Sequence, residues 1–222
     1  MAANNDFWRR YKPSSESVPC LWGDAVLGED VATGRSVLIT RLSSQLGSPS
    51  KFIANLHEML IHLGETKAIP HLAKLLYVGE QDGVAVWVQD VGIARSLSSL
   101  LEESSPLPIG LVIAIAQQIG ECLDALHTRS LPHGGLCPES VMLPETGEIL
   151  VLDAGVALAV DLPALLQAGA MPLASWHAPE IRSGQALSPQ ADVYALGALV
   201  YTLLTGETPA LDADSHYPAD VT

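Results

Sequence analysis

Residues 131–155 decide the fold, and they read LPHGGLCPESVMLPETGEILVLDAG. Two short apolar runs lie inside this stretch, at 141–143 and 149–152, and a turn at 145–147 separates them. Short apolar runs with a Gly-containing turn between them are typical of paired strands. The stretch ends on an acidic residue followed by two small ones, Asp153-Ala154-Gly155. We therefore expect a pair of short strands here, followed by a turn.

Helical segments flank this stretch on both sides. Upstream, apolar residues recur at spacings of three and four from Pro108 to about His127. Downstream, Ser188-Pro189 begins a second strongly periodic helix, which stops at Gly206. Residues 161–173 are rich in Ala and Leu but show no clear period. The chain after residue 90 is therefore expected to be mainly helical.

The first ninety residues differ, because they combine short strand-like runs with one helix. The helix is predicted from Ser48-Pro49 to Gly64, where Phe52 and later apolar residues recur at helical spacing. The strands are predicted within 18–31, at 37–40, at 72–78 and at 84–88. The order is β, β, β, α, β, β, and the composition changes near Asp90. This organisation predicts a small β-rich lobe before a larger helical one.

Composition excludes several classes of protein. Of 222 residues, 48% are hydrophobic, which suffices for a large core, and the net charge of −14 disfavours binding to nucleic acid or anionic membranes. The acidic surplus predicts a solvated face or a docking surface for a basic partner. The N-terminus has no apolar leader, and the run at 107–119 is too short to cross a bilayer. We expect a cytoplasmic protein, with a membrane segment in a longer parent chain left open.

Cysteine and histidine usage predicts no disulfide framework and no metal centre. The three cysteines, at 20, 122 and 137, are widely spaced, and none belongs to a CxxC pair. The seven histidines form neither an HExxH motif nor a cluster with cysteine, and no GxSxG motif is present. We therefore expect no metal cofactor and no nucleophilic hydrolase chemistry.

The motifs, taken in order, resemble those of the eukaryotic-type protein kinases found as bacterial Ser/Thr kinases. Residues 131–141 are similar to the catalytic loop, whose usual form is His-Arg-Asp-Leu-Lys-Pro-Glu-Asn. Residues 153–155 are similar to Asp-Phe-Gly, and Ala178-Pro179-Glu180 matches Ala-Pro-Glu. Residues 192–197 resemble the helix beneath the catalytic loop. The resemblance covers about residues 18–206.

This resemblance implies an α+β fold of two lobes, with a small β-rich N-lobe containing one helix and a larger helical C-lobe. The C-lobe is expected to be incomplete, because the family has further helices after its central one. The expected boundaries are an N-terminal extension at 1–17, the N-lobe at 18–90, the C-lobe at 91–206 and a tail at 207–222.

The positions that carry chemistry in the family are altered here. Gly135 stands at the catalytic Asp, which accepts the substrate's hydroxyl proton, and Cys137 stands at the Lys of the same loop. Ser140 replaces the metal-binding Asn, and Thr40 replaces the Lys that binds the ATP phosphates. The Glu that would pair with that Lys falls near Asn55, with Glu58 one turn on.

Four positions would line the vestigial nucleotide cleft, namely Leu38, Thr40, Val88 and Asp153. Leu38 stands where the family has the Ala that lies against adenine, so its larger side chain is expected to fill the pocket. Asp153 is either a remaining metal ligand, with Ser140 beside it, or a turn-forming residue. We expect no nucleotide cofactor.

The residues that support the fold are retained. By resemblance, His133 and Asp192 brace the catalytic loop, with Asp192 accepting amide hydrogen bonds beneath Gly134 and Gly135. Glu180 usually pairs with an Arg from a helix beyond those predicted here. These three residues are interpreted as structural.

The favoured hypothesis is a bacterial pseudokinase that acts in signalling as a scaffold or regulatory protein-binding module. Its partners would be other proteins, or other domains of a longer parent chain. The alternative is a weakly active or nucleotide-sensing atypical kinase that uses Asp153 as a metal ligand. A third hypothesis is a structural unit without a specific partner.

Overall fold

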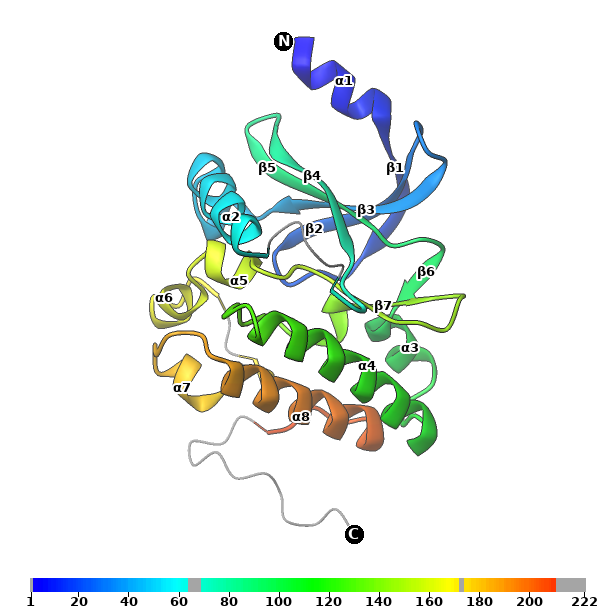
Figure 1. Ribbon diagram of the computed structural model, residues 1–222, viewed down its shortest axis with the longest axis vertical. Coiled ribbons are helices and arrows are strands. Elements are labelled where there is room, and N and C mark those ends of the chain that lie inside the picture. The colour runs from blue at the N-terminus through cyan, green and yellow to red at the C-terminus, as the bar shows by residue number, and fades with distance from the viewer. Residues whose placement is uncertain (1, 64–68, 172–173, 211–222) are drawn as a thin grey trace.

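The computed structural model describes residues 2–63, 69–171 and 174–210, and it has the two lobes that the sequence predicts (Figure 1). A β-sheet with helix α2 (Pro49–Leu63) beside it forms the smaller lobe. Helices α4 (Ile109–His127) and α8 (Pro189–Thr205) pack along each other in the larger lobe. The α+β class is therefore confirmed.

The smaller lobe is built on a five-stranded sheet of order β1-β2-β3-β5-β4, in which neighbouring strands are antiparallel. Its strands are β1 (Tyr11–Val18), β2 (Gly23–Asp30), β3 (Arg35–Leu42), β4 (Lys74–Gln81) and β5 (Val84–Asp90). The register pairs Thr40 with Trp87 and Ile39 with Val88. Because side chains alternate between the two faces of a strand, Thr40 and Trp87 share one face, and Val88 lies on the other.

The lobe begins earlier than residue 18, which corrects the boundary expected from the sequence. Residues 11–18 form the edge strand β1, and the preceding helix α1 (Ala2–Arg10) brings Phe7 onto the sheet. The ring centroid of Phe7 lies 4.7 Å from that of Tyr77 and 5.2 Å from that of Tyr11. Arg10 donates two hydrogen bonds of 3.2 Å to the buried carboxylate of Asp30. The segment is therefore part of the lobe.

The larger lobe contains a second, three-stranded sheet of order β6-β7-β8 and several helices. Its strands are β6 (Ala94–Ser96), β7 (Val141–Pro144) and β8 (Leu150–Val151). The helices in addition to α4 and α8 are α3 (Leu97–Glu103), α5 (Val156–Ala159), α6 (Leu162–Gln167) and α7 (Pro179–Arg182). Short 3₁₀ turns occur at η1 (Ser44–Leu46) and η2 (Pro138–Ser140).

Helix α4 forms the core of the larger lobe. Among the described residues it is the one helix whose length and apolar composition would suffice to cross a membrane. Its inner side chains, including Ile115, Ile119 and Leu126, are buried in one cluster with Leu199 and Leu203 of α8. The helix is therefore longer than the run at 107–119 that was expected to be too short to cross a bilayer. Packing inside the lobe explains its inner face, whereas only 33% of its apolar window is buried.

The docking of α1 is tested by Phe7→Ala. Phe7 is buried against Tyr11 and Tyr77, so the substitution should lower the free energy of unfolding by about 3 kcal/mol. Urea denaturation gives this value, with Ile61→Ala as the control, because Ile61 is 78% exposed and should change stability by less than about 0.5 kcal/mol. Equal effects of the two substitutions would show that α1 does not pack on the sheet in solution.

Candidate functional site

Asp192 organises the loop of residues 131–137, which follows α4 in the larger lobe. It is buried in the first turn of α8, whose N-terminus is capped by Ser188. Its Oδ2 accepts hydrogen bonds from the His133 amide at 2.8 Å and from His127 Nε2 at 2.7 Å, and its Oδ1 accepts one from the Gly134 amide at 2.7 Å. The bracing function expected of Asp192 is present. The amides it holds, however, are those of residues 133 and 134, not 134 and 135.

His133 holds the next amide. The Gly135 N–H donates to its Nδ1 at 3.2 Å, so the ring proton resides on Nε2, which donates to the Leu152 carbonyl at 2.7 Å. Burial lowers the pKa of His133, although the Asp192 carboxylate acts in the opposite direction. The imidazole is therefore neutral, and it links the loop to the segment before Asp153.

The indole of Trp22 occupies the space in front of Gly135. Trp22 lies in the turn between β1 and β2 and is only 1% exposed. A Cβ placed on Gly135 would lie 2.4 Å from Cζ2 of this indole, well inside contact distance. Because the φ angle of Gly135 is ordinary, steric contact and not backbone conformation requires glycine here. The indole thus excludes any side chain from residue 135.

Asp153 faces donors that come from the smaller lobe. Trp87 Nε1 donates to Oδ1 at 2.8 Å. With its amide oriented to suit both partners, Gln89 donates to Oδ1 at 2.7 Å and accepts from the Asp153 N–H at 3.0 Å. Burial raises the pKa of Asp153 to about 6, and hydrogen bonding from Trp87 and Trp22 limits the rise. The carboxylate therefore links the two lobes through direct hydrogen bonds.

Apolar side chains from both lobes surround Leu38. Leu38 is 2% exposed and belongs to a buried cluster with Ala25 from the smaller lobe and Met142 and Leu152 from the larger lobe. Thr40 is fully buried, and its hydroxyl has no hydrogen-bond partner among the described residues. Leu38 therefore packs among apolar side chains of both lobes, and its filling of a nucleotide pocket stays a prediction.

The family model for the protein kinase domain matches residues 23–220 of the chain. The chain belongs to this family. Comparison with solved structures shows the same fold. Two crystal structures of the PknI kinase domain from Mycobacterium tuberculosis superpose on this chain, with TM-scores of 0.71 for a C20A mutant and 0.70 for the other structure. The C20A mutant is 23% identical in sequence to this chain, and the other structure is 24% identical. Each alignment covers 94% of this chain, and it covers 78% of the mutant chain and 77% of the other.

Curated relatives carry the names of serine/threonine-protein kinases. The chain is 29% identical to PknD of M. tuberculosis over 84% of its length and 29% identical to PknA of the same organism over 81%. It is 29% identical over 85% of its length to a probable kinase, PknB, of Lactococcus lactis. It spans 28%, 43% and 30% of the length of these three relatives. The bacterial kinase resemblance is thereby confirmed.

Relative to the kinase family, the metal-binding positions of this domain are occupied by internal contacts. The Ser140 hydroxyl accepts from the Cys137 N–H at 3.0 Å and donates to the Cys137 carbonyl at 2.9 Å. Asp153 is bonded to Trp87 and Gln89, as described above. Within residues 2–63, 69–171 and 174–210, no group of three or more His, Cys, Asp or Glu side chains is arranged to hold a metal ion.

Aromatic packing joins α2 to the sheet beside Thr40, because Trp87 is the register partner of Thr40. The ring centroids of Phe52 on α2 and Trp87 on β5 lie 5.4 Å apart. Asn55, one turn along α2, donates instead to the Ala159 carbonyl at 3.0 Å. The helix is therefore anchored by apolar contact and by one amide bond to α5, without a cation at position 40.

The remaining predicted positions are placed as follows. Cys137 is buried, and burial raises the pKa of its thiol well above the usual value, which leaves it unreactive at neutral pH. Glu180 lies in the first turn of α7, where its carbonyl accepts a hydrogen bond from Ser183 Oγ at 2.8 Å. Val88 does not line the cleft. It packs with Phe7 and Ile39 on the opposite face of the sheet, which corrects the sequence-based assignment.

Three residues of the site escaped the sequence analysis, namely Trp22, Trp87 and Gln89. Trp22 lies within the predicted strand region 18–31, and no motif in the sequence marked its side chain as part of the site. Trp87 and Gln89 could have been found from strand register, since they pair with Thr40 and Leu38 on the cleft face. The registers were not known from the sequence.

The contact between Trp22 and residue 135 is tested by a double-mutant cycle with Gly135→Ala and Trp22→Leu. We expect Gly135→Ala alone to lower the free energy of unfolding by about 2 kcal/mol, because the new methyl group collides with the buried indole. In the Trp22→Leu background the same change should cost at least about 1 kcal/mol less.

Gly120→Ala is the matched control for this cycle. Gly120 lies within α4, and no atom would come within 4 Å of its added Cβ. The substitution should therefore stabilise the domain, by up to about 1 kcal/mol, through helix propensity. Additive effects of the Gly135 and Trp22 substitutions would contradict the contact.

The ionisation of Asp153 predicts a pH dependence of stability. Its pKa rises from an ordinary value of 3.8 to about 6 on folding, so the folded state binds the proton more tightly than the unfolded state. Ionisation is therefore unfavourable to folding, and the contribution of Asp153 to stability falls as the pH rises through about 6.

Comparison with Asp153→Asn isolates this effect, because the other titrating groups are shared. The free energy of unfolding of the original chain, minus that of the variant, should decrease by about 2 kcal/mol between pH 4.5 and pH 7. Urea denaturation across this range measures the difference. A constant difference, or one that increases with pH, would contradict the raised pKa.

Proposed function

We propose that this kinase-family domain is catalytically inactive and acts as a protein-binding or regulatory module. One observation carries the proposal: the buried indole of Trp22 fills the space that a catalytic side chain at residue 135 would need. The partner would be another protein, or another domain of a longer chain, in the cytoplasm.

The chemistry of phosphoryl transfer supports this proposal. The reaction needs a cation on the phosphates, metal ions held by Asp and Asn, and a carboxylate that receives the hydroxyl proton. The corresponding positions carry Thr40, Ser140 and Gly135, of which Thr40 is fully buried and Ser140 is bonded to its own loop. Asp153 alone keeps its family side chain, and that carboxylate is bonded to the smaller lobe.

Retention of the supporting residues gives the proposal its second part. Asp192 still holds the loop through two backbone amides, and His133 still ties it to Leu152. A folded surface is therefore kept although the reactive side chains have been replaced. The named relatives are kinases, so loss of activity would distinguish this chain from them.

A nucleotide-sensing atypical kinase is the second candidate, and the retained Asp153 favours it. With a pKa of about 6 the carboxylate is largely ionised at neutral pH, as a metal ligand must be. This function would require Trp22 and Trp87 to leave the cleft, which would expose two buried indoles to water.

Thermal unfolding with MgATP separates the two candidates. At about 5 mM MgATP we expect the melting temperature to rise by less than about 1 °C, because Leu38 and Trp22 already fill the cleft. The kinase domain of PknA, measured in parallel, provides the positive control. Transfer of labelled phosphate should also be absent, with and without Asp153→Ala.

A rise of several degrees would contradict the closed cleft. Phosphate transfer that disappears in Asp153→Ala would contradict inactivity and would establish the second candidate.

A further inference from the structure

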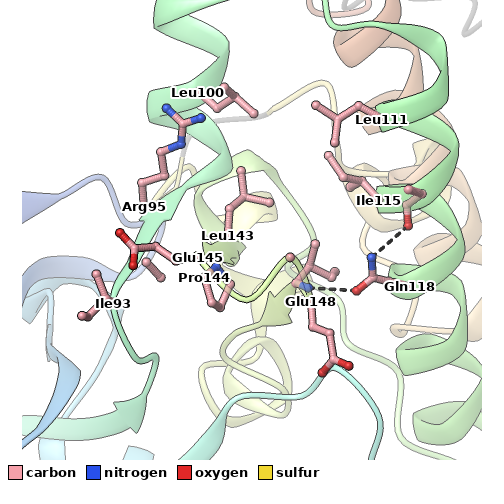
Figure 2. A pocket seen from close by; sticks show the side chains of 14 residues that line it. Ile93, Arg95, Leu100, Leu111, Ile115, Gln118, Leu143, Pro144, Glu145 and Glu148 are labelled. Atoms are coloured by element: carbon pink, nitrogen blue, oxygen red, sulfur yellow. Dashed lines mark hydrogen bonds between the residues drawn. The ribbon is translucent and has the colours of Figure 1, made fainter.

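A groove on the larger lobe lies outside the cleft between the lobes. It has a volume of about 550 Å³, within the range of about 300–1,000 Å³ that is usual for binding sites. Figure 2 shows Leu111, Ile115 and Gln118 along α4 on one side, Ile93 and Arg95 on the other, and Leu143 and Pro144 between them. None of these residues belongs to the kinase motifs.

The groove is apolar at its base and at its edges. Leu100, Ile115 and Ile149 form a buried floor. At the edges, Ile93 is 69% exposed and Leu111 is 41% exposed, and both line the groove. Large apolar side chains that flank a concave apolar surface are typical of interaction sites, whereas single exposed ones are common anywhere.

The charges at the groove are predominantly negative. Glu145 and Glu148 line it, both are exposed, and neither forms an ion pair with the described residues. Arg95 is the one cation in the lining, and its guanidinium donates to the Glu103 carboxylate at 2.9 Å. Two free carboxylates therefore remain beside the apolar surface.

The polar group inside the groove is already satisfied. The Gln118 Oε1 accepts from the Ile149 N–H at 2.9 Å, and its Nε2 donates to the Ala114 carbonyl at 3.3 Å (Figure 2). A ligand thus meets no unpaired amide at this wall. Recognition is left to apolar contact in the centre and to the carboxylates at the rim.

We propose that this groove binds a peptide segment of another protein, in which branched apolar side chains are flanked by Lys or Arg. The apolar side chains would lie between Leu111 and Ile93, and the basic ones would face Glu145 and Glu148. Charge complementarity selects this occupant. The inference rests on the proposed function as a protein-binding module, to which it adds a surface and a partner chemistry.

Two other occupants are disfavoured by charge. Residues 211–222 of this chain contain three Asp and no Lys or Arg, so they would be repelled by the same carboxylates. A second copy of the chain carries the same net charge of −14. A foreign basic segment meets neither obstacle.

The probe is a library of random peptides displayed on phage, selected on the immobilised protein. Phage that also bind the double variant Leu111→Ser/Ile93→Ser are removed in each round. We expect the enriched peptides to contain Leu, Ile or Val next to Lys or Arg. A synthetic, fluorescein-labelled copy of the most enriched peptide is then titrated, and its anisotropy gives the dissociation constant.

Single substitutions locate the peptide on the groove. Leu111→Ser should weaken binding roughly tenfold or more, because it removes an apolar contact at the edge. Glu148→Lys should weaken it about threefold to fivefold, and added salt should reduce that difference. Ile113→Ser is the matched control, since Ile113 lies on α4 and is 52% exposed but does not line the groove. It should leave binding unchanged.

Several results would overturn the groove proposal. These are the absence of enrichment over a blank support, enrichment of acidic or uncharged peptides, and equal weakening by Leu111→Ser and Ile113→Ser. Unchanged circular dichroism and melting temperature of each variant establish that the fold is retained.

The groove and the proposed function can fail separately. If the peptide binds the groove and becomes phosphorylated with MgATP, the groove stands and inactivity is refuted. If no peptide is enriched and MgATP has no effect, the groove is refuted and inactivity stands.

Discussion

The indole of Trp22 lies against the backbone of Gly135, in the volume that any side chain at that position would occupy. This single contact has two consequences for the structure around the cleft. It requires glycine at the position where the family has its catalytic Asp, and it brings the β1–β2 turn down onto the larger lobe. Trp22 belongs to one buried cluster with Phe52 of α2 and Trp87 of β5. The cleft is therefore part of the hydrophobic core.

Polar contacts complete this closure without leaving charges unpaired. Asp153 accepts hydrogen bonds from Trp87 and Gln89, so a residue that would hold a metal ion in the family instead joins the two lobes. Asp192 and His133 hold the loop beneath through the backbone amides of residues 133, 134 and 135. Because buried polar groups are costly when unpartnered, these bonds explain why the loop keeps its shape although its reactive side chains have changed.

Much of the fold was predictable from the sequence, because the motifs at 131–155, 178–180 and 192–197 fix the order of the elements. The helices at α2, α4 and α8 were predicted from apolar spacing and end within a few residues of the expected positions. Strand β1 was missed, since six of its eight residues are exposed and its sequence, YKPSSESV, lacks the alternation of a half-buried strand.

The site was predictable only in part. The altered positions Gly135, Cys137, Ser140 and Thr40 follow from the motifs, so the losses could be listed from the sequence. The side chains that fill the cleft could not be predicted. Trp22, Trp87 and Gln89 lie outside the motifs and reach the cleft only through strand register and turn geometry. Val88 was misplaced for the same reason, by one residue of register.

The indole N–H signals of the four tryptophans offer the most direct measurement. In a ¹⁵N-labelled sample, hydrogen exchange at Nε1 of Trp22 and Trp87 reports whether the cleft stays closed in solution. A closed cleft predicts that both signals exchange slowly and keep their chemical shifts when MgATP is added. Rapid exchange at these two sites would show that the cleft opens, and shifts that saturate with MgATP would show that it binds nucleotide. Either result would contradict the account.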